Sequence, residues 1–152
     1  MPEHRGRALD LTQSLRARGL ETEIDQFHES VPGFNWSRWT VDQIRSSDFV
    51  LCIASPQYKA RVEAQRGLVG GLGAQWEGAF ITEELYSSAA SRDSKFLAVL
   101  FDGTSADHIP DILQPVGRAH YRLPTEDEVL YRALTDQPRV TPEPLGSLII
   151  YP

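Results

Sequence analysis

The chain has 152 residues, of which 41% are hydrophobic and 24% are charged. These proportions predict one soluble globular domain. The formal net charge of −6 argues against nucleic acid as a main partner. No apolar run approaches the roughly 20 residues that a membrane-spanning helix needs, and the charged N-terminus lacks the apolar segment of a signal peptide. The single cysteine, Cys52, excludes an internal disulfide and fits a cytoplasmic location.

The predicted elements alternate between helix and strand. In chain order they are a helix over residues 4–18, a strand over 21–25, a helix over 36–45, a strand over 49–54, a short helix over 56–65, a helix from about residue 76, strands over 95–101 and 120–123, and a helix over 125–134. The apolar runs 49–54 and 95–101 are the clearest strands, because strands covered on both faces read this way. Such alternation predicts an α/β fold with a parallel sheet and helices on both faces.

The last predicted helix and the tail carry two further signals. Thr125 and Glu128 have the spacing of a capping box, with Thr125 as the residue that caps the helix. Residues 137–152 hold four of the ten prolines. We expect this tail to be irregular until the apolar segment 148–151.

A glycine-rich loop over residues 67–75 leads directly into the helix that carries Glu77. Glu77 shares a helical stripe with Ile81 and Leu85, so we expect its carboxylate to face the protein body. Two interpretations remain open at this point. Glu77 is either a functional acid beside Trp76 or a first-turn acid that the helix dipole stabilises.

Polar side chains follow three of the predicted strands. Asp25, Ser55 and Asp102 stand at their carboxyl ends, where ligands gather in parallel α/β sheets. For Ser55 and Asp102 the favoured interpretation is turn chemistry, since Ser and Asp commonly occupy strand exits.

Six motifs occur in an order that resembles a bacterial SEFIR domain, a relative of the Toll/interleukin-1 receptor (TIR) domain. They are GLETEIDQ at 19–26, WSRW at 36–39, SDFVLCIASPQY at 47–58, GAQWEG at 73–78, KFLAVLF at 95–101 and LYRALT at 130–135. The resemblance covers residues 3–146 and leaves 147–152 as a C-terminal tail. It implies a flavodoxin-like, TIR-like three-layer sandwich.

The resemblance implies two alternative functions. Bacterial relatives act as anti-phage effectors that cleave NAD+ at the nicotinamide–ribose bond after self-assembly, whereas animal members are non-catalytic modules for homotypic assembly. The first function makes Glu77 the catalytic residue and NAD+ a substrate, with no cofactor and no metal. Trp76, Tyr58 and Asp25 would then bind the substrate, although core packing is an equal alternative for Trp76 and the favoured one for Tyr58.

The same resemblance places an interface in the loop over residues 26–35. Pro32, Gly33 and Phe34 match the loop through which TIR domains contact one another, with Phe34 expected as its exposed apolar tip. The expected partners are therefore SEFIR or TIR domains, in a homo-oligomer, and neither nucleic acid nor a membrane.

One family element is not found in this sequence. Relatives open with an apolar strand that lies at the centre of the sheet, whereas this sequence opens at the first helix. We expect the first strand to be missing, which would leave the 49–54 strand with unpaired backbone groups. A less favoured alternative is that segment 148–151 occupies the vacant position, from the same chain or from a neighbour.

Overall fold

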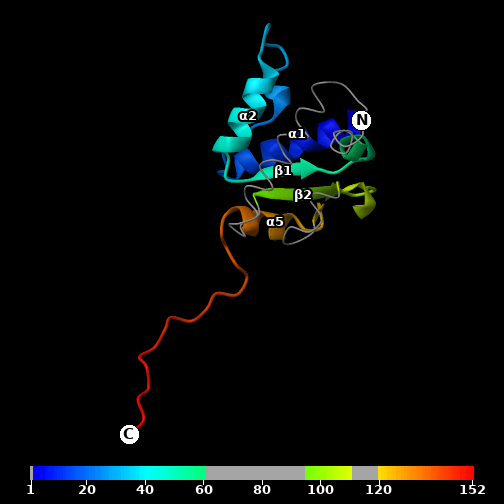
Figure 1. The fold of residues 1–152 in the computed structure, drawn as a ribbon. Helices are drawn as coiled ribbons and strands as arrows, with labels where there is room; N and C mark the ends of the chain where they lie inside the picture. The colour runs from blue at the N-terminus through cyan, green and yellow to red at the C-terminus, as the bar shows by residue number, and fades with distance from the viewer. Residues whose placement is uncertain (1, 61–94, 111–119) are drawn as a thin grey trace.

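The computed structural model describes residues 2–60, 95–110 and 120–152 (Figure 1). Its regular elements are α1 (Pro2–Ala17), η1 (Asp25–His28), α2 (Trp36–Ser46), β1 (Val50–Ile53), β2 (Phe96–Phe101), η2 (Ala106–His108), β3 (Tyr121–Leu123) and α5 (Asp127–Leu134). Residues 56–60 are also helical. The described strands form one parallel sheet in the order β1-β2-β3.

The central strand β2 is buried along its whole length. Val50 of β1 lies opposite Phe96, and Val99 lies opposite Tyr121 of β3. These pairings confirm the strands predicted from the apolar runs, because only a strand with neighbours on both edges and helices on both faces buries every side chain.

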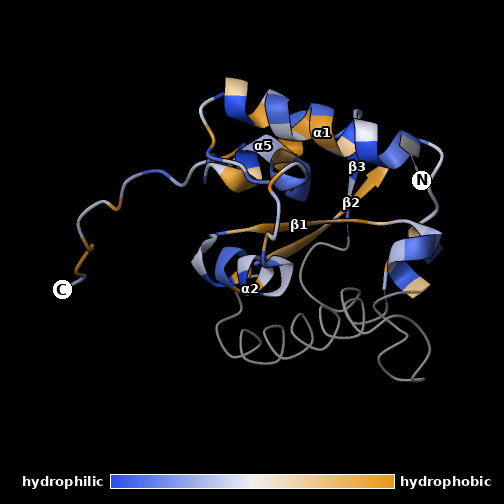
Figure 2. Cartoon of the chain, turned by 90° about the horizontal axis from the view of Figure 1, so that it is seen from above, coloured by the Kyte–Doolittle hydropathy of each residue, from blue (hydrophilic) through white to orange (hydrophobic). Residues whose placement is uncertain are grey.

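Two apolar clusters cover the two faces of this sheet. The cluster on the α2 face contains Ile44, Cys52, Ala54, Phe96, Ala98, Leu100 and Ile109. The other face contains Leu97, Val99, Phe101, Tyr121, Leu123 and Leu130, with Leu11 of α1 packed against it. Figure 2 shows α1 and α5 on one side of the sheet and α2 on the other. The arrangement is the predicted three-layer α/β sandwich.

Helix α1 ends where its sequence predicts. Gly19 has φ of +92°, a conformation that glycine adopts without strain. The backbone N–H of Leu20 donates to Leu15 O at 3.0 Å, which closes the last turn. Arg18 then joins α1 to α5, because its guanidinium pairs with Asp127 at 2.9 Å and lies 4.9 Å from the ring centre of Tyr131.

The strand predicted over residues 21–25 is wrong. Residues 21–24 have no regular structure, and Asp25 begins the 3-10 helix η1. The carbonyl of Thr22 accepts from the Arg16 side chain at 2.8 Å instead of from a strand. Within the described residues no strand lies beside this segment, and an alternating pattern alone cannot supply the missing backbone partners.

The predicted capping box at the last helix is also wrong. Helix α5 begins at Asp127, its N-cap residue is Glu126, and no side chain caps it. The turn that follows β3 causes the shift, because Glu126 N donates to Arg122 O at 2.6 Å and Asp127 N donates to Pro124 O at 3.1 Å. Glu128 instead pairs with Arg132 and Arg139.

The tail after α5 runs away from the domain (Figure 1). Its residues 141–152 have no regular secondary structure and are exposed. The apolar segment 148–151 is 94%, 75%, 87% and 81% exposed along its four residues. The less favoured alternative, in which 148–151 occupies the first-strand position of its own chain, is therefore wrong.

Candidate functional site

Four aromatic side chains gather where η1 meets α2, and we call them the aromatic cluster. They are His28, Phe34, Trp36 and Trp39. The His28 and Phe34 rings stack with centres 4.9 Å apart and planes 6° apart. Trp39 meets His28 edge-on at 5.4 Å, and Trp36 meets Phe34 edge-on at 4.6 Å. These offset and edge-to-face geometries are the favourable ones for aromatic pairs.

The local sequence shapes the loop 29–35 between these rings. Gly33 has φ of +66°, and a side chain there would be strained by this conformation although nothing lies within 4 Å of the added carbon. Asn35 then caps α2, because its side chain accepts from Arg38 N at 3.0 Å. The turn and the cap together bring Phe34 back over His28.

Phe34 is not the exposed apolar tip that the sequence predicted. Its side chain is partly buried, because the stack with His28 holds it against η1. Pro32 and Gly33 are exposed as expected, and the exposed apolar side chain beside them is Val31, at 47%. Val31 was missed. The available signal was an apolar residue directly before a Pro-Gly turn in a polar segment.

Polar contacts tie the same region to α1. Gln26 Nε2 donates to Arg5 O at 2.9 Å, and Arg5 forms an ion pair with Glu29. His28 Nε2 lies 3.1 Å from Glu23 Oε2. The loop therefore has fixed ends, with Val31, Pro32 and Gly33 presented between them.

A second group of side chains lies at the carboxyl end of β2. Arg7 of α1 donates to Asp102 O at 2.8 Å, and Arg122 of β3 donates to Thr104 O at 3.0 Å. His4 Nε2 lies 3.2 Å from the buried Thr104 hydroxyl. Two guanidinium groups thus converge on the turn 102–104 and bind backbone carbonyls there.

The described substrate-binding candidates lie in different parts of the fold. Tyr58 is partly buried against the apolar cluster on the α2 face. Its N–H donates to Ser55 Oγ at 3.0 Å, which confirms turn chemistry for Ser55. Asp25 is exposed at the start of η1. Glu77 and Trp76 lie outside the described residues, so their roles stay predictions.

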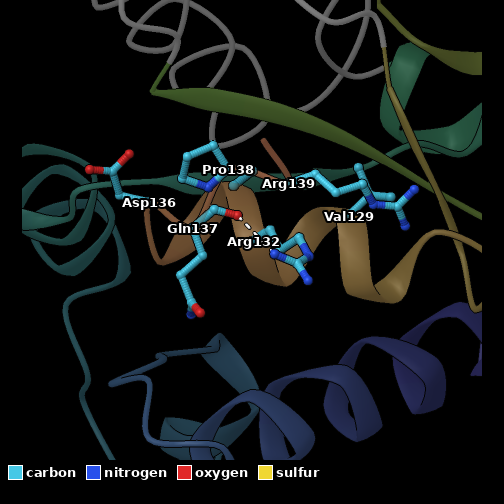
Figure 3. A pocket seen from close by; sticks show the side chains of 7 residues that line it. Val129, Arg132, Asp136, Gln137, Pro138 and Arg139 are labelled. Atoms are coloured by element: carbon cyan, nitrogen blue, oxygen red, sulfur yellow. Dashed lines mark hydrogen bonds between the residues drawn. The ribbon is translucent and has the colours of Figure 1, made fainter. Parts of the chain in front are cut away.

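A shallow pocket of about 470 Å³ lies beside α5 (Figure 3). Its lining residues are Val129, Arg132, Ala133, Asp136, Gln137, Pro138 and Arg139. Arg132 Nη1 donates to Gln137 O at 3.3 Å and holds the start of the tail against the helix. The hydrogen bond from Arg139, with the charge of Arg132, lowers the pKa of the Glu128 carboxyl.

Two classes of site are not found in the described part of the chain. No described helix is long and apolar enough to cross a membrane. Residues 2–60, 95–110 and 120–152 also contain no group of three or more His, Cys, Asp or Glu side chains placed to hold a metal ion.

The parallel sheet between α2 and the α1–α5 layer defines a flavodoxin-like fold of the TIR type. The family model of the SEFIR domain matches residues 2–134, from the start of α1 to the end of α5. The chain therefore belongs to the SEFIR domain family and is a TIR-like signalling module.

Proposed function

We propose that this chain self-assembles with further SEFIR or TIR domains through the loop 29–35. The observation that carries the proposal is the exposed apolar tip on a fixed base. Val31 is 47% exposed, and the stack of Phe34 on His28 holds the loop that presents it. An apolar residue held in place before binding loses little conformational entropy on association.

Trp36 extends the same surface. Its side chain is 41% exposed while its ring contacts Phe34 and Trp39. Partly exposed tryptophans beside a rigid base are frequent anchors of protein interfaces. The interface centre would then consist of Val31, Pro32 and Trp36, with Phe34 supporting it from beneath.

The test compares two exposed valines that differ in location. Val31→Asp places a charge at the loop tip, and Val140→Asp places the same charge in the exposed tail, where Val140 is 84% exposed. Light scattering over a concentration series should show self-association weakened about tenfold or more by Val31→Asp alone. Equal association of both variants and the unchanged protein would contradict a role for the loop.

A second candidate function is that of an anti-phage effector whose assembled form cleaves NAD+, with NAD+ as substrate and no cofactor. Glu77 is its catalytic candidate through the family resemblance. A described feature that favours it is the pair Arg7 and Arg122 at the carboxyl end of β2, since parallel α/β sheets bind ligands there. Two guanidinium groups suit the two phosphates of a dinucleotide.

The chemistry needs one carboxylate. Water adds to the ribose carbon as its bond to the nicotinamide nitrogen breaks, nicotinamide leaves as a neutral molecule, and a proton is released with ADP-ribose. The transition state has oxocarbenium character, which the Glu77 carboxylate would stabilise. Trp76 and Tyr58 would stack on the rings of the substrate, and Asp25 would contribute a polar contact.

NAD+ turnover by the assembled protein tests this function. Glu77→Gln should reduce turnover by about a hundredfold or more, whereas Glu143→Gln in the exposed tail should leave it unchanged. An active Glu77→Gln variant would remove the catalytic assignment. Assembly without turnover in all three proteins would favour the non-catalytic module.

A further inference from the structure

The aromatic cluster presents one tryptophan to solvent on a fixed base. Trp36 is 41% exposed, and its ring lies edge-on to Phe34 at 4.6 Å and to Trp39 at 6.0 Å. These contacts hold the indole in place before any partner arrives. A held, partly exposed tryptophan offers the best aromatic surface for a cation, because its π-system attracts positive charge.

The rings that carry a cation in the described residues carry arginine. Arg16 lies 5.8 Å from the ring centre of Phe27, and Arg18 lies 4.9 Å from that of Tyr131. No described arginine or lysine lies over a ring of the aromatic cluster. The exposed surface of Trp36 is therefore available to a cation from another molecule.

The segment that carries the aromatic cluster is acidic. Residues 19–37 contain no Lys or Arg, and their acidic side chains are Glu21, Glu23, Asp25 and Glu29. All four acidic residues are exposed. Glu23 Oε2 lies 3.1 Å from His28 Nε2, which places one carboxylate at the edge of the cluster. Negative charge around an aromatic surface attracts basic partners and repels acidic ones.

The bases near this surface are matched by acids. Arg5 forms an ion pair with Glu29, and Arg38 lies 3.9 Å from Asp42. Asp25, at the start of η1, forms no ion pair within the described residues. The surface therefore keeps a negative charge that a partner can neutralise.

We propose that Trp36 takes an arginine side chain of the partner domain, with the guanidinium stacked on the indole and attracted by Glu23 and Asp25. This inference rests on the function proposed for the loop 29–35, because it names the partner chemistry that the same surface accepts. A guanidinium fits better than an ammonium, since it is planar, less strongly hydrated and able to stack. Arginine is also enriched at the centres of protein interfaces.

The test titrates the full chain with blocked tetra-arginine and tetra-lysine peptides. Nuclear magnetic resonance of the Trp36 indole N–H locates the binding, and calorimetry gives the Kd. Tetra-arginine should shift the Trp36 signal to saturation and bind about fivefold more tightly than tetra-lysine. It should also inhibit the self-association seen by light scattering, because it occupies the position of the partner's arginine.

Three variants separate stacking from charge. Trp36→Leu should raise the Kd for tetra-arginine about fivefold or more, because it removes the aromatic surface. Glu23→Gln keeps an acceptor for His28 and removes the charge, so it should raise the Kd about twofold. Glu143→Gln removes the same charge from the exposed tail and should leave the Kd unchanged.

Three results would overturn the proposal. They are an unshifted Trp36 signal, equal affinity for the two peptides, and a Kd that Trp36→Leu does not change. The last two would assign the binding to net charge alone. Tetra-arginine that binds without inhibiting self-association would likewise exclude an arginine from the partner contact.

The loop interface fails separately. Self-association that survives Val31→Asp contradicts the proposed function, whereas the Trp36 signal still decides whether arginine binds there. Self-association that Val31→Asp weakens, in a protein whose Trp36 signal never responds to tetra-arginine, keeps the loop interface and removes the arginine.

Discussion

Strands β1 and β3 are the two outer strands of the described parallel sheet, and they differ in whether their outward backbone groups are hydrogen-bonded. At β3 the chain turns back within four residues, so that Glu126 occupies both outward backbone groups of Arg122. At β1 the outward groups of Leu51 and Ile53 have no hydrogen-bond partner within the described residues. The difference shows that a turn directly after a strand can satisfy the outward backbone groups of that strand, as Glu126 does for Arg122.

The two edges also differ in length and in the support beneath them. The closed strand β3 has three residues, and Tyr131 and Arg18 join the helix beside it to α1. The open strand β1 has four residues and is partly exposed at Val50, Leu51 and Ile53. Short, internally capped strands such as β3 discourage pairing between molecules.

The largest expected change in the free energy of unfolding comes from a substitution in β2, the central strand that pairs with both β1 and β3. Leu100 of β2 is fully buried, so Leu100→Ala should lower the free energy of unfolding by about 2–5 kcal/mol. Leu145→Ala removes the same atoms from a fully exposed site and should change it by less than about 0.5 kcal/mol. Urea unfolding measures both. Equal midpoints for the two variants would mean that β2 is not the core of the domain.

A smaller change in the free energy of unfolding is expected when the hydrogen bond between Glu126 and the outer edge of β3 is removed. Glu126→Ala removes the acceptor of Arg122 N–H and should cost about 1–3 kcal/mol of unfolding free energy. It should also speed exchange of the Arg122 amide. Glu126→Gln keeps an acceptor oxygen in the same place and is the matched control. If the alanine variant retains slow Arg122 exchange and full stability, the side chain does not close this edge.

The smallest expected effect is a pH dependence of the free energy of unfolding, caused by Glu128 of α5. Arg139 and Arg132 lower the folded-state pKa of Glu128 from 4.5. The pair therefore stabilises the fold above the unfolded pKa, and this contribution disappears as pH falls through the folded pKa. Because the carboxyl is exposed, the loss should be small. Denaturation midpoints at pH 7 and pH 3 should differ more for the unchanged protein than for Glu128→Gln, and equal differences would contradict the pairing.

The central sheet was predictable because its signals are local. Residues 49–54 and 95–101 are continuous apolar runs, and burial on both faces accounts for both. The end of the first helix before Gly19 and the start of the second at Trp36 were predictable for the same reason, since each depends on nearby residues. The family followed from motif order.

The errors came from contacts between segments. The 21–25 pattern resembled a strand, but a strand needs a partner that a local pattern cannot reveal. Thr125 matched a capping rule, yet the hydrogen bonds of Glu126 to Arg122 moved the helix start. Phe34 was wrongly predicted at the exposed loop tip, because its stack with His28 is a tertiary contact that the local sequence does not reveal. The assignment of Glu77 remains a prediction, since that residue lies outside the described residues.

The single cysteine of this chain can report on the stability of strand β1. Cys52 is the only cysteine, it lies between Leu51 and Ile53, and its side chain is 4% exposed. A thiol reagent can reach it only when β1 separates from its surroundings, so the labelling rate measures the opening of that one strand. Because the sequence has no other cysteine, this measurement requires no substitution.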